Sequence, residues 1–391
     1  MASMSIKRFF LAPSEDLVQL SSQFRLVKET LRRNGSYLPA TPDEPPEETQ
    51  PYDADRTDDD SNFDRKNLCD PIEEFEEGKE PYVNQGSALL RTECNFFKFF
   101  LDGSIRTYYL GEQIEDNRSY PLIATEVASA AIKRADDGRA SVSKLMRKVA
   151  LLVPPSPPVR PQTVRDLIEL RANFSAVRSP IKLDIEQLER DIHQPGVDLR
   201  TSLLGKARAV MHEIEHTLAR SLKREKGEWL ILDGAIRRPE FLGLDETIGL
   251  AKSFSRNPVF HISGRFKDVV AMLSGLKEGA RTVVFRHSGE GGDPVRKRVA
   301  FWYLRLRSGR GLQGPLQGIV KIDYRSRGDL LKADDIELVN TISRALLAEK
   351  YVSPYPTPRW HAHIYPIYVA ENYIKSSLFS PLAFRGHFGG I

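Results

Sequence analysis

The sequence has few cysteines and no long apolar run. Among its 391 residues only Cys69 and Cys94 occur, far apart and outside any CxxC pattern. This scarcity argues against a zinc site built from thiolates and fits a reducing compartment. No apolar run approaches the roughly 20 residues that a membrane-spanning helix needs. Residues 1–14 contain no long apolar segment of the secretory kind, so we expect a cytoplasmic protein with no membrane association.

The chain also lacks a strong excess of either charge. Its formal net charge is +4, from 57 basic and 53 acidic residues. This value permits binding to nucleic acid without arguing for it, because the distribution of charge matters more than the sum. With 40% hydrophobic and 28% charged residues, the composition is that of a soluble globular protein with one large core or two ordinary ones.

An acidic, proline-rich segment divides the chain. Residues 1–38 are predicted to form a helical arm, because their apolar residues recur at helical spacing. Residues 39–87 are predicted to be an acidic, flexible insert, since the stretch from Pro39 to Asp60 has almost no apolar side chains to bury. The parts expected beyond it are a folded domain at residues 88–379, a helical insertion within it at residues 155–226, and a tail at residues 380–391.

The folded domain mixes strand and helix patterns. Residues 94–111 indicate two strands joined by a turn at Asp102-Gly103. Further strands are expected at residues 229–236, 259–263, 282–287, 298–307 and 317–324. Helices are expected at residues 121–134, 140–150, 163–224 (with breaks near Pro180 and Pro195), 245–254, 266–275, 334–350 and 364–378. This mixture predicts an α/β fold with one core and a helical insertion between two Asp-Gly strands.

Two short strings of the domain are nearly alike. Phe99 to Asp102 and Leu230 to Asp233 are apolar runs that end in Asp, and a Gly follows each. If these strands pair side by side, Asp102 and Asp233 come within reach of one divalent metal, as hydrolysis of a phosphodiester requires. The alternative is a pair of ordinary strand-end turns, because Asp-Gly is a common turn dipeptide.

A third carboxylate is expected on the helix that precedes the second string. In residues 203–222, Glu215 lies about 60° from the centre of the apolar face, whereas Glu213 lies about 140° away and should face water. A carboxylate at the margin of a buried face costs free energy unless a metal or another partner compensates it. Glu215 is therefore the candidate and Glu213 the reserve. Glu126, an acid with apolar neighbours whose alternative is an ordinary early-helix residue, and Asp323, at a strand end, rank below Asp102, Asp233 and Glu215.

Basic residues suggest contacts with a phosphate backbone. Alternation along residues 301–307 would place Arg305 and Arg307 on one sheet face, beside Phe301 and Tyr303, where they could follow a nucleic acid strand and stack bases. A solvated strand face is the alternative. Further candidates for phosphate contacts are Arg237, Arg238 and Lys252. No base-reading module is present, so any binding should be independent of sequence.

The late string Tyr355-Pro356-Thr357-Pro358, followed by Ala362-His363, completes a set of motifs. In their order and spacing these motifs resemble the NurA nuclease family, in which an Asp-Gly-Ser strand, a helix-borne Glu, a second Asp-Gly strand and a Tyr-Pro-x-Pro segment with Ala-His follow one another. The segment Ile248 to Lys252 also looks like a stretch of that family. The resemblance covers roughly residues 90–375 and selects His363 over His361.

The resemblance implies a fold and an activity. The fold would be an RNase H-like mixed sheet flanked by helices. The activity would be a DNA nuclease that depends on Mn²⁺ or Mg²⁺, acts on DNA ends, forms a homodimer and works with a HerA-type hexameric ATPase in DNA repair or phage defence. The residues implied as metal ligands and catalytic groups are Asp102, Glu215, Asp233 and His363, with Tyr355 orienting the DNA strand. Two alternatives stay open: a DNA-binding regulatory subunit without catalysis, and a phosphotransferase of the acetate and sugar kinase type.

Overall fold

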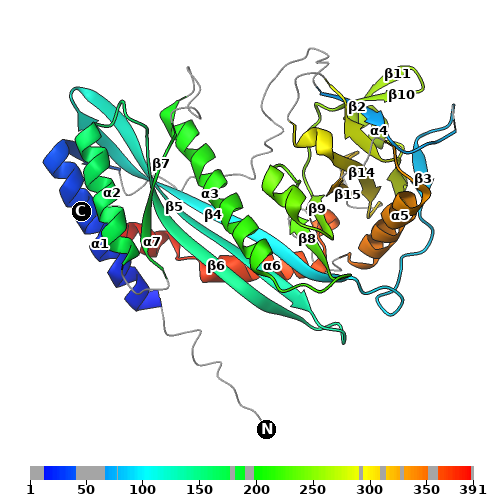
Figure 1. Cartoon of the computed structure of the whole chain (residues 1–391), viewed down its shortest axis with the longest axis horizontal. Coiled ribbons are helices and arrows are strands. Elements are labelled where there is room, and N and C mark those ends of the chain that lie inside the picture. Colours follow the sequence, from blue (N-terminus) through cyan, green and yellow to red (C-terminus); the bar gives the residue numbers. More distant parts are fainter. Residues whose placement is uncertain are drawn as a thin grey trace, which may run out of the picture.

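The framework of the protein is one large mixed β-sheet with helices on both faces (Figure 1). The computed structural model describes residues 13–40, 67–76, 78–176, 181–189, 198–289, 294–308, 314–325, 330–350 and 360–388. The α/β class predicted from the sequence is confirmed. In these ranges no helix combines the length and apolar character needed to cross a membrane.

The described residues form β-strands, α-helices and short 3₁₀ turns. The strands are β1 (Ser36–Pro39), β2 (Leu68–Pro71), β3 (Tyr82–Asn84), β4 (Phe97–Glu115), β5 (Arg118–Arg134), β6 (Ala140–Val153), β7 (Leu183–Gln187), β8 (Trp229–Asp233), β9 (Thr247–Ala251), β10 (Val259–Ile262), β11 (Arg265–Asp268), β12 (Ala280–Thr282), β13 (Phe285–His287), β14 (Val299–Arg305) and β15 (Ile319–Arg325). The helices are α1 (Pro13–Asn34), α2 (Pro161–Ser175), α3 (Leu199–Ser221), α4 (Val269–Leu273), α5 (Ala333–Ala348), α6 (Tyr365–Ser377) and α7 (Pro381–Phe388), with 3₁₀ turns η4 (Pro239–Gly243), η5 (Arg296–Arg298) and η6 (Trp360–Ala362).

Long strands connect the two ends of the molecule. Along the sheet the order is β11-β10-β2-β13-β14-β15-β9-β8-β4-β5-β6-β7. Figure 1 shows β4, β5 and β6 running from the end that carries α1 and α2 toward the end that carries β8, β9 and α5. Strand β8 pairs in parallel with both β4 and β9, while β4 and β5 form a long antiparallel pair. The parallel strands therefore lie where the long hairpin meets the rest of the sheet.

Three predictions around the first Asp-Gly string are wrong. Strand β4 does not turn at Asp102-Gly103 but continues, with Asp102 opposite Ala130 and Gly103 opposite Ser129 on β5. The segments 121–134 and 140–150, predicted as helices, belong to β5 and β6. Most of β5 is buried on both faces, so its apolar residues show no alternation that would separate a strand from a buried helix.

Other segments agree more closely with the strands and helices predicted from the sequence. Strands β8, β10, β14 and β15 and helices α5 and α6 are confirmed within a few residues, and the segment 282–287 is shared between β12 and β13. The predicted helix 245–254 is wrong, because the buried β9 occupies it. The segment 266–275 holds the end of β11 and the short α4. The insertion contains α2 and α3 as expected, with β7 between them.

The two ends of the described chain pack together. Helix α1 lies within the predicted helical arm, residues 1–38, but the end of that range belongs to β1, and residues 1–12 lie outside the described residues. Phe384 of the predicted tail lies on α7, is buried, and stacks on Tyr108 of β4 with ring centroids 4.0 Å apart. Phe24 of α1 contacts the ring of Phe384 edge-on. The arm and the tail therefore share one core with the long strands.

Part of the segment predicted as a flexible insert, residues 39–87, belongs to the sheet. Residues 41–66 and 77 lie outside the described residues, but β2 pairs with β10 and β13 inside the sheet, and β3 pairs with β12. Glu73, which follows β2, is buried and accepts hydrogen bonds from the two terminal guanidinium nitrogens of Arg281, at 2.7 and 2.8 Å. It also accepts the N–H of Val284. This buried ion pair fastens residues 67–76 to the core.

We expect Glu73→Gln to destabilise the protein by about 3–5 kcal/mol, because it leaves the fully buried Arg281 guanidinium without a compensating charge. Chemical denaturation monitored by circular dichroism measures the change. Glu76→Gln is the matched control, since Glu76 pairs with Lys79 on the surface and should contribute no more than about 0.5 kcal/mol. Equal stability of both variants would contradict the assigned role of Glu73.

Candidate functional site

The two predicted aspartates lie side by side. On the parallel strands β4 and β8, Leu101 is in register with Leu232, so Asp102 and Asp233 are the next residues on neighbouring strands. Neighbouring strands lie about 4.8 Å apart. Two acids that are far apart in the sequence therefore meet at the point where the β4–β8 pairing ends.

Both aspartates point to the same face of the sheet. Phe100 and Ile231, two residues earlier on each strand, pack in the core cluster that contains Ile367 and Ala370 of α6. We call this side the α6 face. Side chains alternate along a strand, so Asp102 and Asp233 lie on the α6 face as well. The residues between, Leu101 and Leu232, pack with Leu218 of α3 on the opposite side, the α3 face.

The end of β8 opens the sheet beside Asp102. Gly234 follows Asp233 with a φ of +117°, a backbone conformation that residues with a side chain rarely adopt. The chain turns away there, while β4 continues past Asp102 with β5 on its other edge, and β1 pairs with β4 farther along, from Gly111 to Ile114. The edge of β4 beyond Leu101 is thus not covered by β8.

Lys252 completes the centre of this cluster. Its Nζ lies 2.8 Å from Asp233 Oδ2, and its side chain is 6% exposed. Burial alone would lower the pKa of Lys252, but the charges of Asp233 and Asp102 raise it above its ordinary value, so the side chain is an ammonium. Lys252, predicted to contact a DNA phosphate, therefore lies inside the acidic cluster rather than on an open surface.

Helix α6 adds a histidine and an acid. His363 precedes the helix, is 4% exposed, and has its Nδ1 3.9 Å from Glu371 Oε2. Burial would raise the pKa of Glu371, but Lys375, Lys252 and His363 together lower it, so this carboxylate stays charged. Sequence reasoning missed Glu371. The signal was present, because Glu371 follows Ile367 by four residues and so shares its buried side of the predicted helix 364–378.

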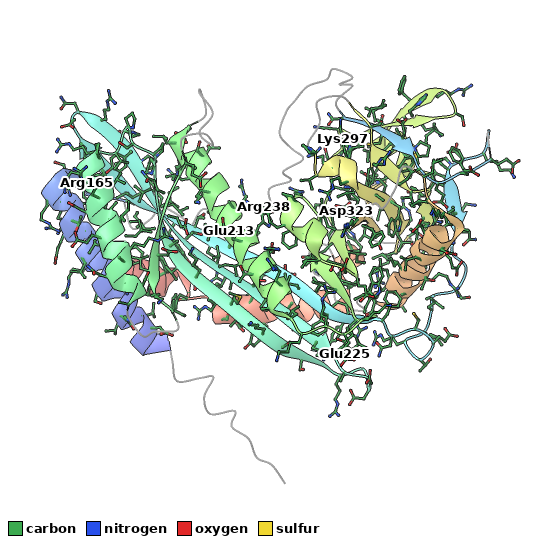
Figure 2. All side chains as sticks on the ribbon, in the orientation of Figure 1. Arg165, Glu213, Glu225, Arg238, Lys297 and Asp323 are labelled. Carbon is green, nitrogen blue, oxygen red and sulfur yellow. The ribbon has the colours of Figure 1, made fainter. Side chains whose placement is uncertain are left out.

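Glu215 approaches from the other side of β4. It is buried on α3 and its Oε2 lies 2.8 Å from His212 Nδ1. A Cβ atom placed on Gly103 would overlap the Glu215 carboxylate, with Cδ only 2.8 Å away. Gly103 faces the α3 side, so Glu215 reaches the open edge of β4 opposite Asp102. Glu213 is exposed on the same helix, which agrees with its place as the reserve (Figure 2).

These charges act strongly on Asp102. Burial raises the pKa of Asp102 well above its ordinary value, and the nearby charge of Asp233 raises it further. Lys252 opposes the shift, whereas Glu215 and Glu371 add to it. The four carboxyl groups of this cluster therefore outnumber its two ammonium groups, Lys252 beside Asp233 and Lys375 beside Glu371.

The donor set fits a divalent cation with oxygen ligands. Asp233 Oδ1 is buried and has no hydrogen-bond partner among the described residues, which is costly unless another group binds it. Carboxylate oxygens are the ligands that Mg²⁺ and Mn²⁺ prefer. Within the described ranges, no group of three or more His, Cys, Asp or Glu side chains is already arranged around a metal position. Lys252 supplies part of the charge that a cation would supply.

The other acidic candidates have structural partners. Glu126 lies buried in β5, not in a helix, where it pairs with Arg147 at 2.9 Å and accepts the N–H of Phe379. Asp323 accepts the N–H of Ile236 and pairs with Lys321, at 2.9 Å each. Their low rank as site residues is consistent with these bonds.

The proposed stacking face on β14 is wrong. Phe301 and Tyr303 are fully buried against α4 and its neighbours. Arg305 is also buried and donates to the carbonyl oxygens of Leu276 and Pro315, at 2.5 and 2.8 Å, among others. It therefore holds loops together and does not present a charge to DNA. The alternation along β14 correctly placed these side chains on one face of the sheet, but it could not show that other parts of the chain cover this face.

The remaining candidates are placed as follows. Arg237, Arg238 and Arg307 are half-buried, and Figure 2 marks Arg238 on the segment after β8. His361 accepts the N–H of Gly318 at 3.0 Å, so of the two histidines only His363 is placed beside the acids. Tyr355 lies outside the described residues.

Comparison with known proteins adds no family assignment. No protein-family model matches the chain, and no curated protein matches it. The NurA resemblance stays a prediction from the motifs, and the geometry of the site carries the argument.

The raised pKa of Asp102 predicts how stability depends on pH. Above the ordinary carboxyl pKa of about 4, the folded protein binds more protons than the unfolded chain, so its stability falls as pH rises. Asp102→Asn removes this dependence. We expect the variant to melt at a higher temperature than the wild type at pH 8, with the difference shrinking toward pH 4, as thermal unfolding across this range would measure.

Asp245→Asn serves as the control, because Asp245 is 83% exposed and its replacement should leave the pH profile unchanged. The raised pKa of Asp102 would be contradicted if Asp102→Asn melted below the wild type at pH 8 and its melting temperature changed with pH in the same way as that of the wild type.

Proposed function

We propose that the protein is a divalent-metal-dependent DNA nuclease with an RNase H-like core, acting on DNA ends without sequence preference. One observation carries the proposal: Asp102 and Asp233 lie adjacent on parallel strands, on one face, with an unbonded buried oxygen on Asp233. The order of the motifs, which resembles the NurA family, supports the same activity.

The charges of the site favour a metal-dependent reaction. A DNA phosphate is an anion, and the surplus of carboxylates around Asp102 would repel it. A cation bound by Asp102 and Asp233, with Glu215 or Glu371, would reverse this repulsion, and it would activate a water and stabilise the leaving oxygen. The Lys252 ammonium offsets part of the negative charge beside Asp233. His363, held near Glu371, is placed to exchange a proton or to contact the phosphate.

Partners follow from the resemblance. The proposal includes a homodimer, a HerA-type hexameric ATPase, a cytoplasmic location, and a role in DNA repair or phage defence. A second candidate function is a DNA-binding regulatory subunit of such an ATPase that does not cut. The contact between Lys252 and Asp233 favours this alternative, because an ammonium there competes with a metal for the same carboxylate.

The proposed activity predicts metal-dependent loss of linear DNA. Purified protein with Mn²⁺ or Mg²⁺ should degrade the substrate, and EDTA should stop the reaction. Asp102→Asn and Asp233→Asn should each lower the rate by at least about 100-fold, since each removes a charged metal ligand. A gel-based time course measures the rates. Undiminished cutting by either folded variant would contradict the catalytic assignment, and a wild type that binds DNA but never cuts would favour the regulatory subunit.

The same assay identifies the third acid. Glu215→Gln and Glu371→Gln each remove one candidate charge, and Glu213→Gln is the matched control on the exposed side of α3. The control should cut at the wild-type rate. For each variant we measure the Mn²⁺ concentration that gives half of the maximal rate. The variant with the larger increase in this concentration identifies the carboxylate that binds the cation. Unaltered metal dependence in both would show that two aspartates alone form the ligand set.

A further inference from the structure

Lys252 lies in a row with the two aspartates on three neighbouring parallel strands. Asp102 follows the part of β4 that pairs with β8, Asp233 ends β8, and Lys252 follows β9. Leu250 of β9 is in register with Asp233 and packs in the core covered by α6, so Lys252, two residues later, also points to the α6 face. The three strands therefore bring two carboxylates and one ammonium to one place.

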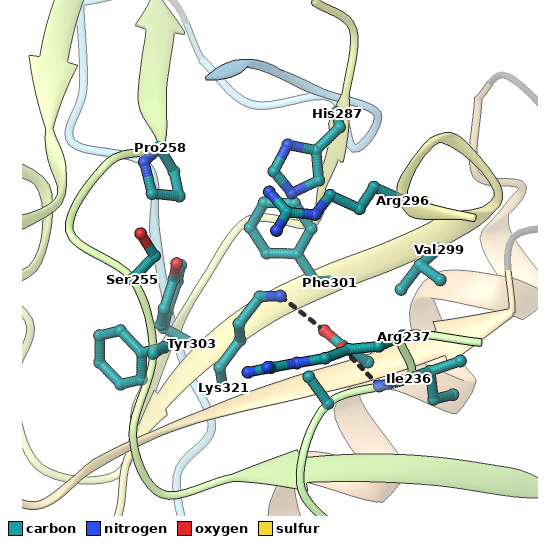
Figure 3. A pocket seen from close by; sticks show the side chains of 13 residues that line it. Ile236, Arg237, Ser255, Pro258, His287, Arg296, Val299, Phe301, Tyr303 and Lys321 are labelled. Carbon is teal, nitrogen blue, oxygen red and sulfur yellow. Dashed lines mark hydrogen bonds and ion pairs between the residues drawn. The ribbon is translucent and has the colours of Figure 1, made fainter. Parts of the chain in front are cut away.

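Among the described residues, Lys252 is the only partner of the Asp233 carboxylate in a hydrogen bond or ion pair. Its Nζ lies 2.8 Å from Oδ2, and Oδ1 is buried without a hydrogen-bond partner in the same ranges. A second lysine–aspartate pair of the sheet differs: Figure 3 shows the Lys321 ammonium and the Ile236 N–H bonded to one carboxylate, that of Asp323. The backbone helps to fix Asp323, whereas Asp233 is fixed by one side chain that can move.

The charge of Lys252 is smaller than the charge that it faces. Burial would lower the pKa of Lys252, but Asp233, Asp102 and Glu371 raise it above its ordinary value, so the side chain is an ammonium. Lys375 bonds Glu371 but is 56% exposed, so water screens its charge. One buried ammonium thus faces three carboxyl groups, and a divalent cation at Asp233 would compensate them more fully.

Lys252 can leave Asp233 while the strands stay in place. It follows the last residue of β9, Ala251, which is paired with Lys321 of β15. Its ammonium is carried by a flexible chain of four carbons, so rotations of the side chain alone can move it. Its new position must supply an anion, because a buried charge without a partner is costly. A DNA phosphate beside the cation is such an anion, and lysine binds phosphate as a point charge.

We propose that Lys252 exchanges partners as the site is loaded: it pairs with Asp233 in the metal-free protein, and it contacts a phosphate of the DNA when a divalent cation binds Asp233. The inference rests on the proposed function. Lys252 keeps its proton in both positions, so the exchange moves a charge and releases no proton. Because the ammonium opposes the cation until a phosphate receives it, cation and DNA bind cooperatively, and each strengthens the binding of the other by the same factor.

The first test measures Mn²⁺ binding to the full chain without DNA, by calorimetry at pH 8 after treatment with EDTA and dialysis. Lys252→Met removes the ammonium and keeps an unbranched side chain. We expect it to bind Mn²⁺ at least about tenfold more tightly than the wild type, because a competing charge is lost. Lys252→Gln, whose amide can still donate to Asp233, should change the affinity in the same direction, and it carries the test if circular dichroism shows that Lys252→Met is unfolded.

Lys375→Met is the matched control, because Lys375 is exposed and bonds Glu371 rather than an aspartate. Its Mn²⁺ affinity should stay within about twofold of the wild type, since water screens an exposed ion pair. The exchange would be overturned by unchanged or weaker Mn²⁺ binding in the folded Lys252 variants, by an equal gain in Lys375→Met, or by no Mn²⁺ binding in any of these proteins.

The second test adds a short DNA duplex with phosphorothioate linkages, which resist cutting. In the wild type, Mn²⁺ should bind at least about tenfold more tightly with DNA than without it. This factor should be at least about fivefold smaller in Lys252→Met and unchanged in Lys375→Met. An equal factor in the wild type and Lys252→Met would overturn the phosphate as the second partner of Lys252. Coupled binding by a protein that never cuts DNA would support the exchange and contradict only the nuclease activity.

Discussion

The parallel pairing of β4 with β8 is the constraint on which the candidate site depends. It sets Leu101 beside Leu232 and so brings Asp102 next to Asp233. The alternation of the strands then decides what surrounds them, because Phe100 and Ile231 must point into the core covered by α6. Lys252 enters the same space from the end of β9, the next strand of the sheet. A slip of one residue in this register would turn both acids toward α3.

The cost of this arrangement is electrostatic. Burial raises the pKa of Asp102, and repulsion by the neighbouring Asp233 carboxylate raises it further. Lys252 reduces this repulsion without removing it. A fold selected for stability alone would replace such a pair with apolar residues, and the proposed binding of a cation accounts for its presence. The buried ion pair of Glu73 with Arg281 is different, since its bonds are complete and it holds a segment of the chain in place.

Local patterns predicted much of the fold and part of the site. Strand β8 and helices α5 and α6 have clear periodicity and clear boundaries, and the buried position of Glu215 followed from the helical wheel. Segments buried on both sides were misread, because β5 and β9 show no alternation and resemble helices by composition. The continuation of β4 through Asp102-Gly103 was missed for a related reason: the dipeptide favours a turn locally, but pairing with β5 outweighs that preference.

Contacts between distant elements were beyond the reach of such patterns. The sequence predicts that Arg305 and Lys252 contact DNA, but Arg305 donates to the carbonyl oxygen of Leu276 after α4, and Lys252 pairs with Asp233. Periodicity places Glu371 on the buried side of α6 through its spacing from Ile367, but its partners Lys252 and His363 lie outside the helix and cannot be inferred from that spacing. Charge and periodicity show which residues share one face of a strand or helix. Which other element covers that face depends on the arrangement of the whole sheet.

The central claim is that the paired aspartates bind a divalent cation. The most direct measurement is a crystal structure of the wild-type protein with Mn²⁺ at pH 8, with the metal located by its anomalous scattering. The account predicts an anomalous peak within about 2.3 Å of oxygens from both Asp102 and Asp233, with the Lys252 ammonium shifted away from Asp233. Density that shows Lys252 still bound to Asp233 and no metal at either carboxylate would contradict it.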